Sequence, residues 1–147
     1  MAVAKNIEEL IVWRLAVELR DEIFKLTEDG AGARDRDFKE QIRKSARSSA
    51  ANLAEGFGAF YPGEFARFGR IARRSMIETR NHLYDARKHA YFAPADSRRL
   101  IHLTFRAQKA TTRLVKYLDS CKHRRGPDGW TLSREAASRT HELPEPF

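Results

Sequence analysis

The chain has 147 residues, a length that suits one domain with a single hydrophobic core. Its hydrophobic content of 41% is ordinary for a globular protein, and no apolar run reaches the roughly 18 residues of a membrane-spanning helix. The charged N-terminus lacks the apolar stretch of a signal peptide, and Cys121, the single cysteine, excludes an internal disulfide. We therefore expect a cytoplasmic protein without a membrane partner.

The net charge of +8 is unevenly distributed along the chain. Residues 7–28 carry three basic and six acidic side chains, whereas residues 63–92 carry seven basic and three acidic ones. Residues 96–125 carry nine basic and two acidic side chains. The positive charge is therefore predicted to lie on the second half of the fold.

The first predicted helix begins after Asn6, with Glu9 three residues later as in a capping box. It ends before Gly30, which suits the left-handed position after a helix. Its apolar positions recur every three or four residues, which is helical spacing: Val12, Ala16, Leu19, Ile23 and Leu26.

The second predicted helix runs from near Asp37 to about Gly58 and has an unusually polar buried face. The helical positions that precede Gly56 on this face are Phe38, Ile42, Ser45, Ser49 and Asn52. Buried polar groups are costly unless they are paired. The spacing therefore predicts that this helix packs against specific polar partners, and the segment from Phe65 to Glu78 is the candidate.

The third predicted helix begins at Pro62 and continues to about Tyr91. Pro94 separates it from a fourth helix, which we expect Asp96 or Ser97 to cap. The core positions of the fourth helix follow heptad spacing: Leu100, Leu103, Ala107, Ala110, Leu114, Tyr117 and Cys121.

Short connections between long helices favour antiparallel neighbours. The pattern therefore predicts an all-α, up-down-up-down four-helix bundle over residues 1–125. Residues 126–147 are rich in Pro, Gly, Ser and Glu, and we expect them to form a mobile tail.

Three motifs resemble one family of small bacterial proteins. They are Gln41-Ile42-Arg43-Lys44-Ser45-Ala46-Arg47-Ser48, then Asn52-Leu53-Ala54-Glu55-Gly56-Phe57-Gly58, then Arg67-Phe68 with Ile71-Ala72, Ser75 and Glu78. The sequence is similar to the four-helix-bundle 23S rRNA intervening-sequence (S23-like) proteins. It departs from their pattern at Arg47, where that family is usually apolar, and at Ala50, where it often has proline. The resemblance implies a homo-oligomer, often a pentamer, without known catalytic activity. A related branch serves reverse transcriptases of diversity-generating retroelements as a basic accessory protein.

Basic side chains form rows on the last two predicted helices, and we interpret them as a nucleic-acid-binding surface. No zinc-finger or RNA-recognition motif is present, so binding is expected to follow the phosphate backbone, with RNA favoured. Two alternatives remain open: a solvated face, or contacts with the acidic first helix of a neighbouring subunit. The predicted binding residues are Arg73, Arg80, Arg87, Arg99, Arg106, Lys109, Arg113 and Lys116.

A second apolar row flanks the core positions of the fourth helix. It consists of Ile101, Phe105, Val115 and Leu118, and a monomeric bundle needs only one such row per helix. We interpret this row as a homo-oligomer interface. The alternatives are a wider core stripe or cover from the tail.

The polar residues of the family motif are predicted to form a buried network in which Glu55 or Glu78 pairs with an arginine such as Arg67. This network would fix the register of the helices rather than add stability. Its predicted members are Asn52, Glu55, Arg67, Ser75 and Glu78.

A row of acidic and histidine residues on the third predicted helix is the nearest approach to a metal site: Glu78, His82, Asp85 and His89. One helix alone rarely completes such a site, so we predict no metal, no cofactor and no catalytic residue. The leading functional hypothesis is non-enzymatic binding of RNA or another nucleic acid. The runner-up is a protein-binding scaffold, such as an accessory subunit of a reverse transcriptase.

Overall fold

The structure, a computed structural model, describes residues 4–59 and 61–121. They form a 3₁₀-helix, η1 (Ile7–Glu9), and five α-helices: α1 (Ile11–Leu26), α2 (Gly30–Arg34), α3 (Arg36–Phe57), α4 (Pro62–Lys88) and α5 (Pro94–Ser120). Helix accounts for 85% of this part of the chain, which contains no strand. The all-α prediction is confirmed, whereas the predicted tail lies outside the described residues.

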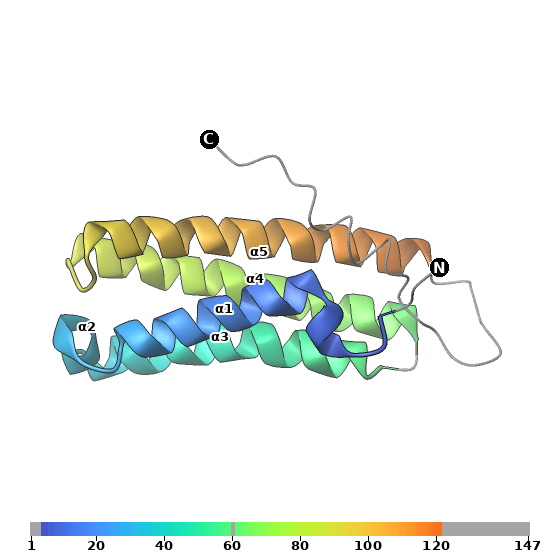
Figure 1. Ribbon diagram of the computed structural model, residues 1–147, viewed down its shortest axis with the longest axis horizontal. Coiled ribbons are helices and arrows are strands. Elements are labelled where there is room, and N and C mark those ends of the chain that lie inside the picture. Colours follow the sequence, from blue (N-terminus) through green and yellow to red (C-terminus); the bar gives the residue numbers. More distant parts are fainter. Residues whose placement is uncertain (1–3, 60, 122–147) are drawn as a thin grey trace.

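The four long helices lie side by side along the length of the molecule (Figure 1). α3 and α4 pack against each other, as do α4 and α5, while α1 contacts both α3 and α5. The core between them holds fully buried side chains from each of the four, including Leu19, Ile42, Met76 and Leu114. Burying a side chain of this size stabilises the fold by about 1.5–3 kcal/mol relative to leaving it in water.

The N-terminal helix does not start where its sequence pattern predicted. Asn6 makes no side-chain capping bond and precedes the single turn of η1, and α1 begins only at Ile11. Leu10 between the two has extended backbone and is 2% exposed. The extended backbone at Leu10 therefore separates η1 from α1 and interrupts the helix that Asn6 was expected to cap.

The connection from α1 to α3 also differs from the prediction. Gly30 has a positive φ of 82°, but it opens the short helix α2 rather than ending α1. α1 ends at Leu26, and Arg43 of α3 donates hydrogen bonds to the carbonyl oxygens of Phe24 and Thr27, both at 3.1 Å. A cation at the C-terminus of a helix satisfies carbonyl groups that have no partner within the helix.

The ends of the other helices are set by Asp35, Pro62 and Pro94. Asp35 caps α3 by accepting a hydrogen bond from the Phe38 N–H at 3.0 Å, so α3 begins slightly before the predicted start. Pro62 begins α4 as predicted, and Pro94 begins α5, so neither Asp96 nor Ser97 caps that helix as expected. A proline is favoured in the first turn because its missing N–H would have no partner there.

Asp35 also ties the start of α3 to the connection between α4 and α5. The Tyr91 hydroxyl donates a hydrogen bond of 2.6 Å to the Asp35 carboxylate. This bond, followed by the Phe38 N–H, lowers the pKa of Asp35 below its ordinary value of 3.8. The same bond raises the pKa of the Tyr91 hydroxyl.

Hydroxyl groups pair across the contact between α3 and α4. Thr79 donates to Ser45 Oγ at 2.8 Å, and the hydroxyl oxygens of Ser48 and Ser75 lie 2.8 Å apart. The Asn52 amide donates to the Ser48 carbonyl oxygen at 2.8 Å. The polar face of the second predicted helix therefore meets polar partners on α4, within the segment that the sequence indicated.

Gly56 sets how closely α3 approaches α4. A Cβ atom placed there would lie 2.4 Å from Phe65 Cδ2 and 2.9 Å from Phe68 Cβ, both on α4. Contacts this short do not occur, so a side chain at this position must push the two helices apart.

We expect Gly56→Ala to lower the free energy of unfolding by about 1–3 kcal/mol through overpacking. Gly58→Ala is the matched control, because its Cβ would meet nothing closer than 3.5 Å and its φ of −77° suits alanine. Chemical denaturation of both variants measures the difference. Equal stability of the two variants would contradict the close approach of α3 and α4.

Candidate nucleic-acid interface

Arg99, the first residue of the predicted basic row on α5, forms ion pairs with two carboxylates. Its guanidinium lies 2.8 Å from Glu22 of α1 and 3.0 Å from Asp96. The hydrogen bonds to Asp96 and Glu22 raise the pKa of Arg99 above its ordinary value. This arginine joins α5 to α1, and the two carboxylates balance its charge.

The predicted binding arginines of α4 lie across its contact with α5. Arg73 Nε donates to Thr112 Oγ1 at 2.9 Å, and Arg80 Nη1 donates to Gln108 Oε1 at 2.6 Å. The Arg80 guanidinium also covers the Phe105 ring, 4.0 Å from its centroid. Both arginines are half-buried, and their first role is to hold α4 against α5.

Arg87, the third arginine of the α4 row, lies nearer the end of the helix. Its guanidinium is 5.2 Å from the centroid of the Tyr84 ring on the same helix. It makes no ion pair with a described carboxylate, and its side chain is exposed.

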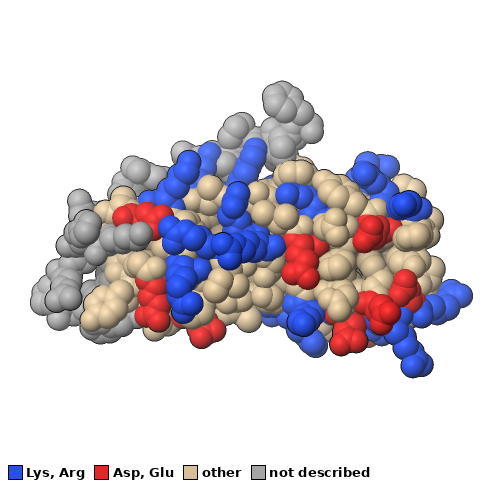
Figure 2. All heavy atoms as spheres, turned by 180° about the vertical axis from the view of Figure 1, so that it is seen from behind, with Lys and Arg blue, Asp and Glu red and all other residues tan. Residues whose placement is uncertain are grey.

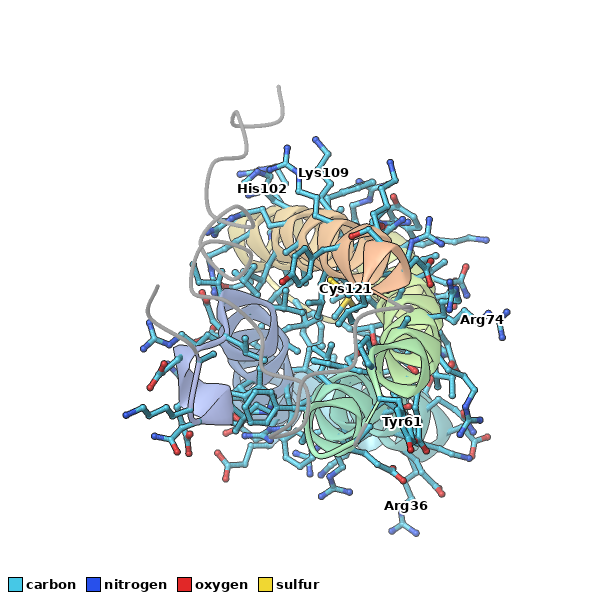
Figure 3. All side chains as sticks on the ribbon, turned by 90° about the vertical axis from the view of Figure 1, so that its right-hand side faces the viewer. Arg36, Tyr61, Arg74, His102, Lys109 and Cys121 are labelled. Atoms are coloured by element: carbon cyan, nitrogen blue, oxygen red, sulfur yellow. The ribbon has the colours of Figure 1, made fainter. Side chains whose placement is uncertain are left out.

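The outer side of α5 carries basic side chains that, unlike Arg99, are not paired with a described carboxylate. Arg106, Lys109 and Lys116 are exposed, and none forms an ion pair with the carboxylates that the structure describes. Arg113 is exposed on the same helix. Figure 3 shows Lys109 and His102 pointing away from the other helices. We call Arg106, Lys109 and Lys116 the α5 ridge.

Positive charge also extends over the neighbouring surface. In Figure 2, many Lys and Arg groups project from the upper part of the face, on the side where α5 lies. Most Asp and Glu groups on this face lie lower. The local excess of one sign over part of the surface raises the concentration of counter-ions there, including phosphates.

The profile of a family described as 23S rRNA-intervening sequence protein matches residues 8–113, which run from η1 into α5. The chain belongs to this family. A search of the curated proteins finds no significant match. The matched range contains the α3–α4 contact and most of the basic residues described above, but it ends before Lys116.

Two residues of the apolar row on α5 are not surface residues in this member of the 23S rRNA-intervening sequence family. Val115 is 9% exposed and Leu118 is fully buried, so the prediction that they form an exposed interface is wrong. α5 packs against both α1 and α4 and therefore buries a wider stripe than one neighbour requires. Gly69 of α4 brings the helices close, because a Cβ there would lie 2.8 Å from Val115 Cγ2.

Three of the four large apolar side chains that are exposed among the described residues lie where α4 meets α5, and the fourth is Tyr61, just before α4. Phe105 is 39% exposed, and Ile77 and Tyr84, one heptad apart on α4, are both 38% exposed. Arg80, between these two positions, reaches Phe105. We call Ile77, Tyr84 and Phe105 the seam patch. Ile77 and Tyr84 were not predicted from the sequence, although their heptad spacing could have indicated a shared face. Ile101, which the sequence placed in the exposed row, is partly buried.

The predicted buried ion pair is also wrong. Glu55, Arg67 and Glu78 are exposed, and no ion pair among the described residues joins Arg67 to either glutamate. Arg67 instead lies 4.8 Å from the centroid of the Phe68 ring. The helix contact is satisfied by neutral hydroxyl groups, which are far cheaper to bury than charges.

The described residues contain no group of three or more His, Cys, Asp or Glu side chains that could hold a metal ion. His82 Nε2 approaches only Glu78, at 3.7 Å, within the predicted row on α4. None of the helices described here is long and apolar enough to cross a membrane.

Proposed function

We propose that this protein is a non-enzymatic, homo-oligomeric basic bundle that binds RNA, or another nucleic acid, through its phosphate backbone. The α5 ridge is the observation that carries the proposal. Its three cations are exposed on one helix and have no described carboxylate to neutralise them. The family description, which names a 23S rRNA intervening sequence, is consistent with an RNA ligand.

The framework of the proposal is an antiparallel, up-down-up-down four-helix bundle. The short segments that join α3 to α4 and α4 to α5 support this arrangement, because they leave no length for a crossover. Such a bundle is a rigid support that holds the charges of α5 at fixed spacing. Arg106 and Lys116 are ten positions apart, which corresponds to about 15 Å of helix.

Backbone-led binding follows from the chemistry of the ridge. Lysine and arginine attract phosphates regardless of sequence, and each neutralised phosphate releases a condensed counter-ion. The ridge offers no arrangement of side chains that reads base edges, so we expect strong dependence on salt and little preference for sequence.

The seam patch supports self-association. A cluster of large apolar side chains on an otherwise charged surface is typical of a protein contact. A symmetric assembly through this patch, possible as a pentamer by the family resemblance, would repeat the α5 ridge on every subunit. The combined field would be stronger than that of one chain.

A second candidate function is a protein-binding scaffold, for example an accessory subunit of a reverse transcriptase. The seam patch favours this candidate as well, because it could contact a different protein instead of another copy. Nuclease-resistant capture of one protein, without retention of RNA, would favour the scaffold.

Neutralising the α5 ridge tests the proposed function. For Arg106→Gln, Lys109→Gln and Lys116→Gln combined, we expect the salt slope of RNA binding to fall by about 2, since each single-strand phosphate contact contributes about 0.7. Fluorescence anisotropy of a labelled single-stranded RNA across a salt series measures the slope. The matched control is Arg14→Gln, Arg20→Gln and Lys25→Gln on α1, which removes the same charge. Identical slopes for the two variants would contradict a binding role for the ridge.

Replacing the central aromatic of the seam patch tests self-association. We expect Phe105→Ser to shift the protein from oligomer towards the 17.0 kDa monomer, because it removes apolar surface from the contact. Sedimentation velocity measures the mass. Tyr61→Ser, which changes an aromatic side chain that is 50% exposed, is the control and should leave the mass unchanged. A wild-type protein that sediments as a monomer at all concentrations would contradict the proposal.

A further inference from the structure

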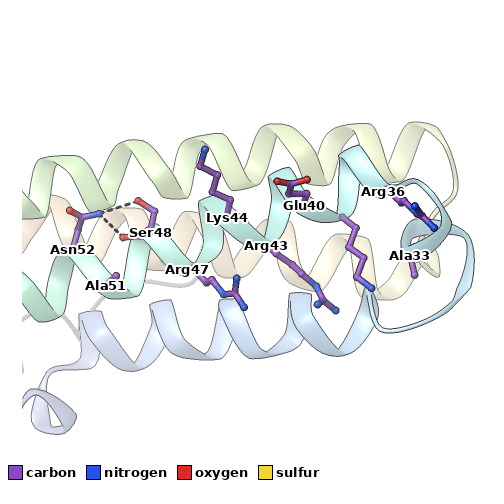
Figure 4. A pocket seen from close by; sticks show the side chains of 10 residues that line it. Ala33, Arg36, Glu40, Arg43, Lys44, Arg47, Ser48, Ala51 and Asn52 are labelled. Carbon is purple, nitrogen blue, oxygen red and sulfur yellow. Dashed lines mark hydrogen bonds between the residues drawn. The ribbon is translucent and has the colours of Figure 1, made fainter.

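A second basic surface lies on α3, where the surface forms a groove. The groove has a volume of about 770 Å³ and is lined by residues of α2 and α3. Figure 4 shows its side chains along one side of α3, between the flanking helices α1 and α4. The charged residues that line it are Arg36, Lys39, Arg43, Lys44, Arg47 and Glu40.

The groove is strongly positive, because its five cations face a single carboxylate. None of the five forms an ion pair with a carboxylate that the structure describes, Glu40 included. The acidic side chains of α1 that do pair are engaged elsewhere, since Asp21 pairs with Arg20 and Glu22 with Arg99. An anion entering the groove would therefore meet charges that are not already neutralised.

Two of these cations are held in place by one aromatic ring. The guanidinium of Arg43 lies 4.3 Å from the centroid of the Phe24 ring, and that of Arg47 lies 4.5 Å from it. Arg43 is fixed further by its bonds to the end of α1, including one of 2.8 Å to Thr27 Oγ1. Arg47 makes no hydrogen bond to a described residue, so stacking orients its guanidinium and leaves its N–H groups available.

The lining favours a phosphate strand over a protein partner. Protein interfaces are depleted of lysine and enriched in aromatic and apolar side chains at their centres. The groove instead presents Lys39 and Lys44 beside its arginines, and its lining has no aromatic side chain and only Ala33 and Ala51 as apolar members. Arg36 and Arg47 are eleven positions apart, which corresponds to about 16 Å of helix.

We propose that the α3 groove binds the sugar–phosphate strand of RNA as a second contact, separate from the α5 ridge. This inference rests on the proposed function and assigns it an additional site. The two surfaces are on different sides of the subunit, because Figure 3 shows Arg36 and Lys109 projecting in opposite directions. Pre-oriented guanidinium groups lose little side-chain entropy on binding. The groove is therefore expected to increase the affinity for RNA as well as the rate of association.

Three variants, each of which loses three positive charges, test this assignment. The groove variant combines Lys39→Gln, Lys44→Gln and Arg47→Gln, and it leaves Arg43 intact because that residue anchors α1. It is compared with the ridge variant and the α1 control described above, each of which also loses three charges. Binding of a fluorescein-labelled single-stranded RNA is measured by anisotropy across a salt series, and thermal melting confirms that each variant is folded.

We expect the groove variant to lose about 2 units of salt slope and to bind about 100-fold more weakly at 0.1 M salt, with no such change in the α1 control. Loss with the groove variant alone would support the groove and overturn the role of the ridge. Loss with the ridge variant alone would overturn the groove and leave the proposed function standing. No loss with either variant would overturn both assignments.

Protection of lysines from acetylation provides a second measurement on the wild-type protein. RNA should protect Lys39 and Lys44 from acetic anhydride, as read by mass spectrometry, whereas Lys25 on α1 should react equally with and without RNA. Unchanged acetylation of Lys39 and Lys44 in saturating RNA would overturn the proposal. So would a groove variant that alters the sedimenting mass but not RNA affinity, because the groove would then be a contact between subunits.

Discussion

The contact between α3 and α4 is the constraint on which the rest of the structure depends. It combines the absence of a side chain at Gly56 with paired hydroxyl groups at Ser45 and Thr79. Small residues let the two helices come close, and the hydroxyl pairs satisfy each other without a buried charge. With its small polar face turned towards α4, α3 must present its arginines and lysines on the outside. The position of the α3 groove is thus a direct result of how the core is packed.

Chemically similar arginines therefore have different roles in this protein. Arg43, Arg73 and Arg80 lie along neighbouring helices and donate to carbonyl, hydroxyl or amide oxygens. Arg47 and Arg106 make no such bond to a described residue and face outwards. The first group stabilises the packing of the helices, and the second group leaves charge available to an anion. The two proposed nucleic-acid contacts depend on the second group, so a count of basic residues overstates the binding surface.

The sequence predicted the helices better than it predicted which neighbours their side chains contact. Periodicity identifies which residues share a face, and it predicted that Ser45 and Ser75 lie at a helix contact. It does not say how many neighbours a helix has, which is why Val115 and Leu118 were expected at the surface. α5 contacts two other helices, and these residues fill the additional contact.

The sequence also did not predict the hydrogen-bond partners of long polar side chains, because those partners are distant in sequence. Arg43 finds Thr27 sixteen positions away, and Arg80 finds Gln108 twenty-eight positions away. Arg67 and Glu78 were expected to form a buried pair from their motif, yet both remain in water. The α3 groove was missed for the same reason, since the guanidinium groups of Arg43 and Arg47 are oriented by the ring of Phe24 on α1.

A double-mutant cycle between Ser45 and Thr79 tests the central claim most directly. Ser45→Ala, Thr79→Val and the combined variant, measured by chemical denaturation, give the coupling energy across the α3–α4 contact. Because the two hydroxyls are buried and 2.8 Å apart, we predict a coupling of about 0.5–1.5 kcal/mol. A coupling of zero would show that the hydroxyl pair does not hold α3 and α4 together, and it would contradict this account.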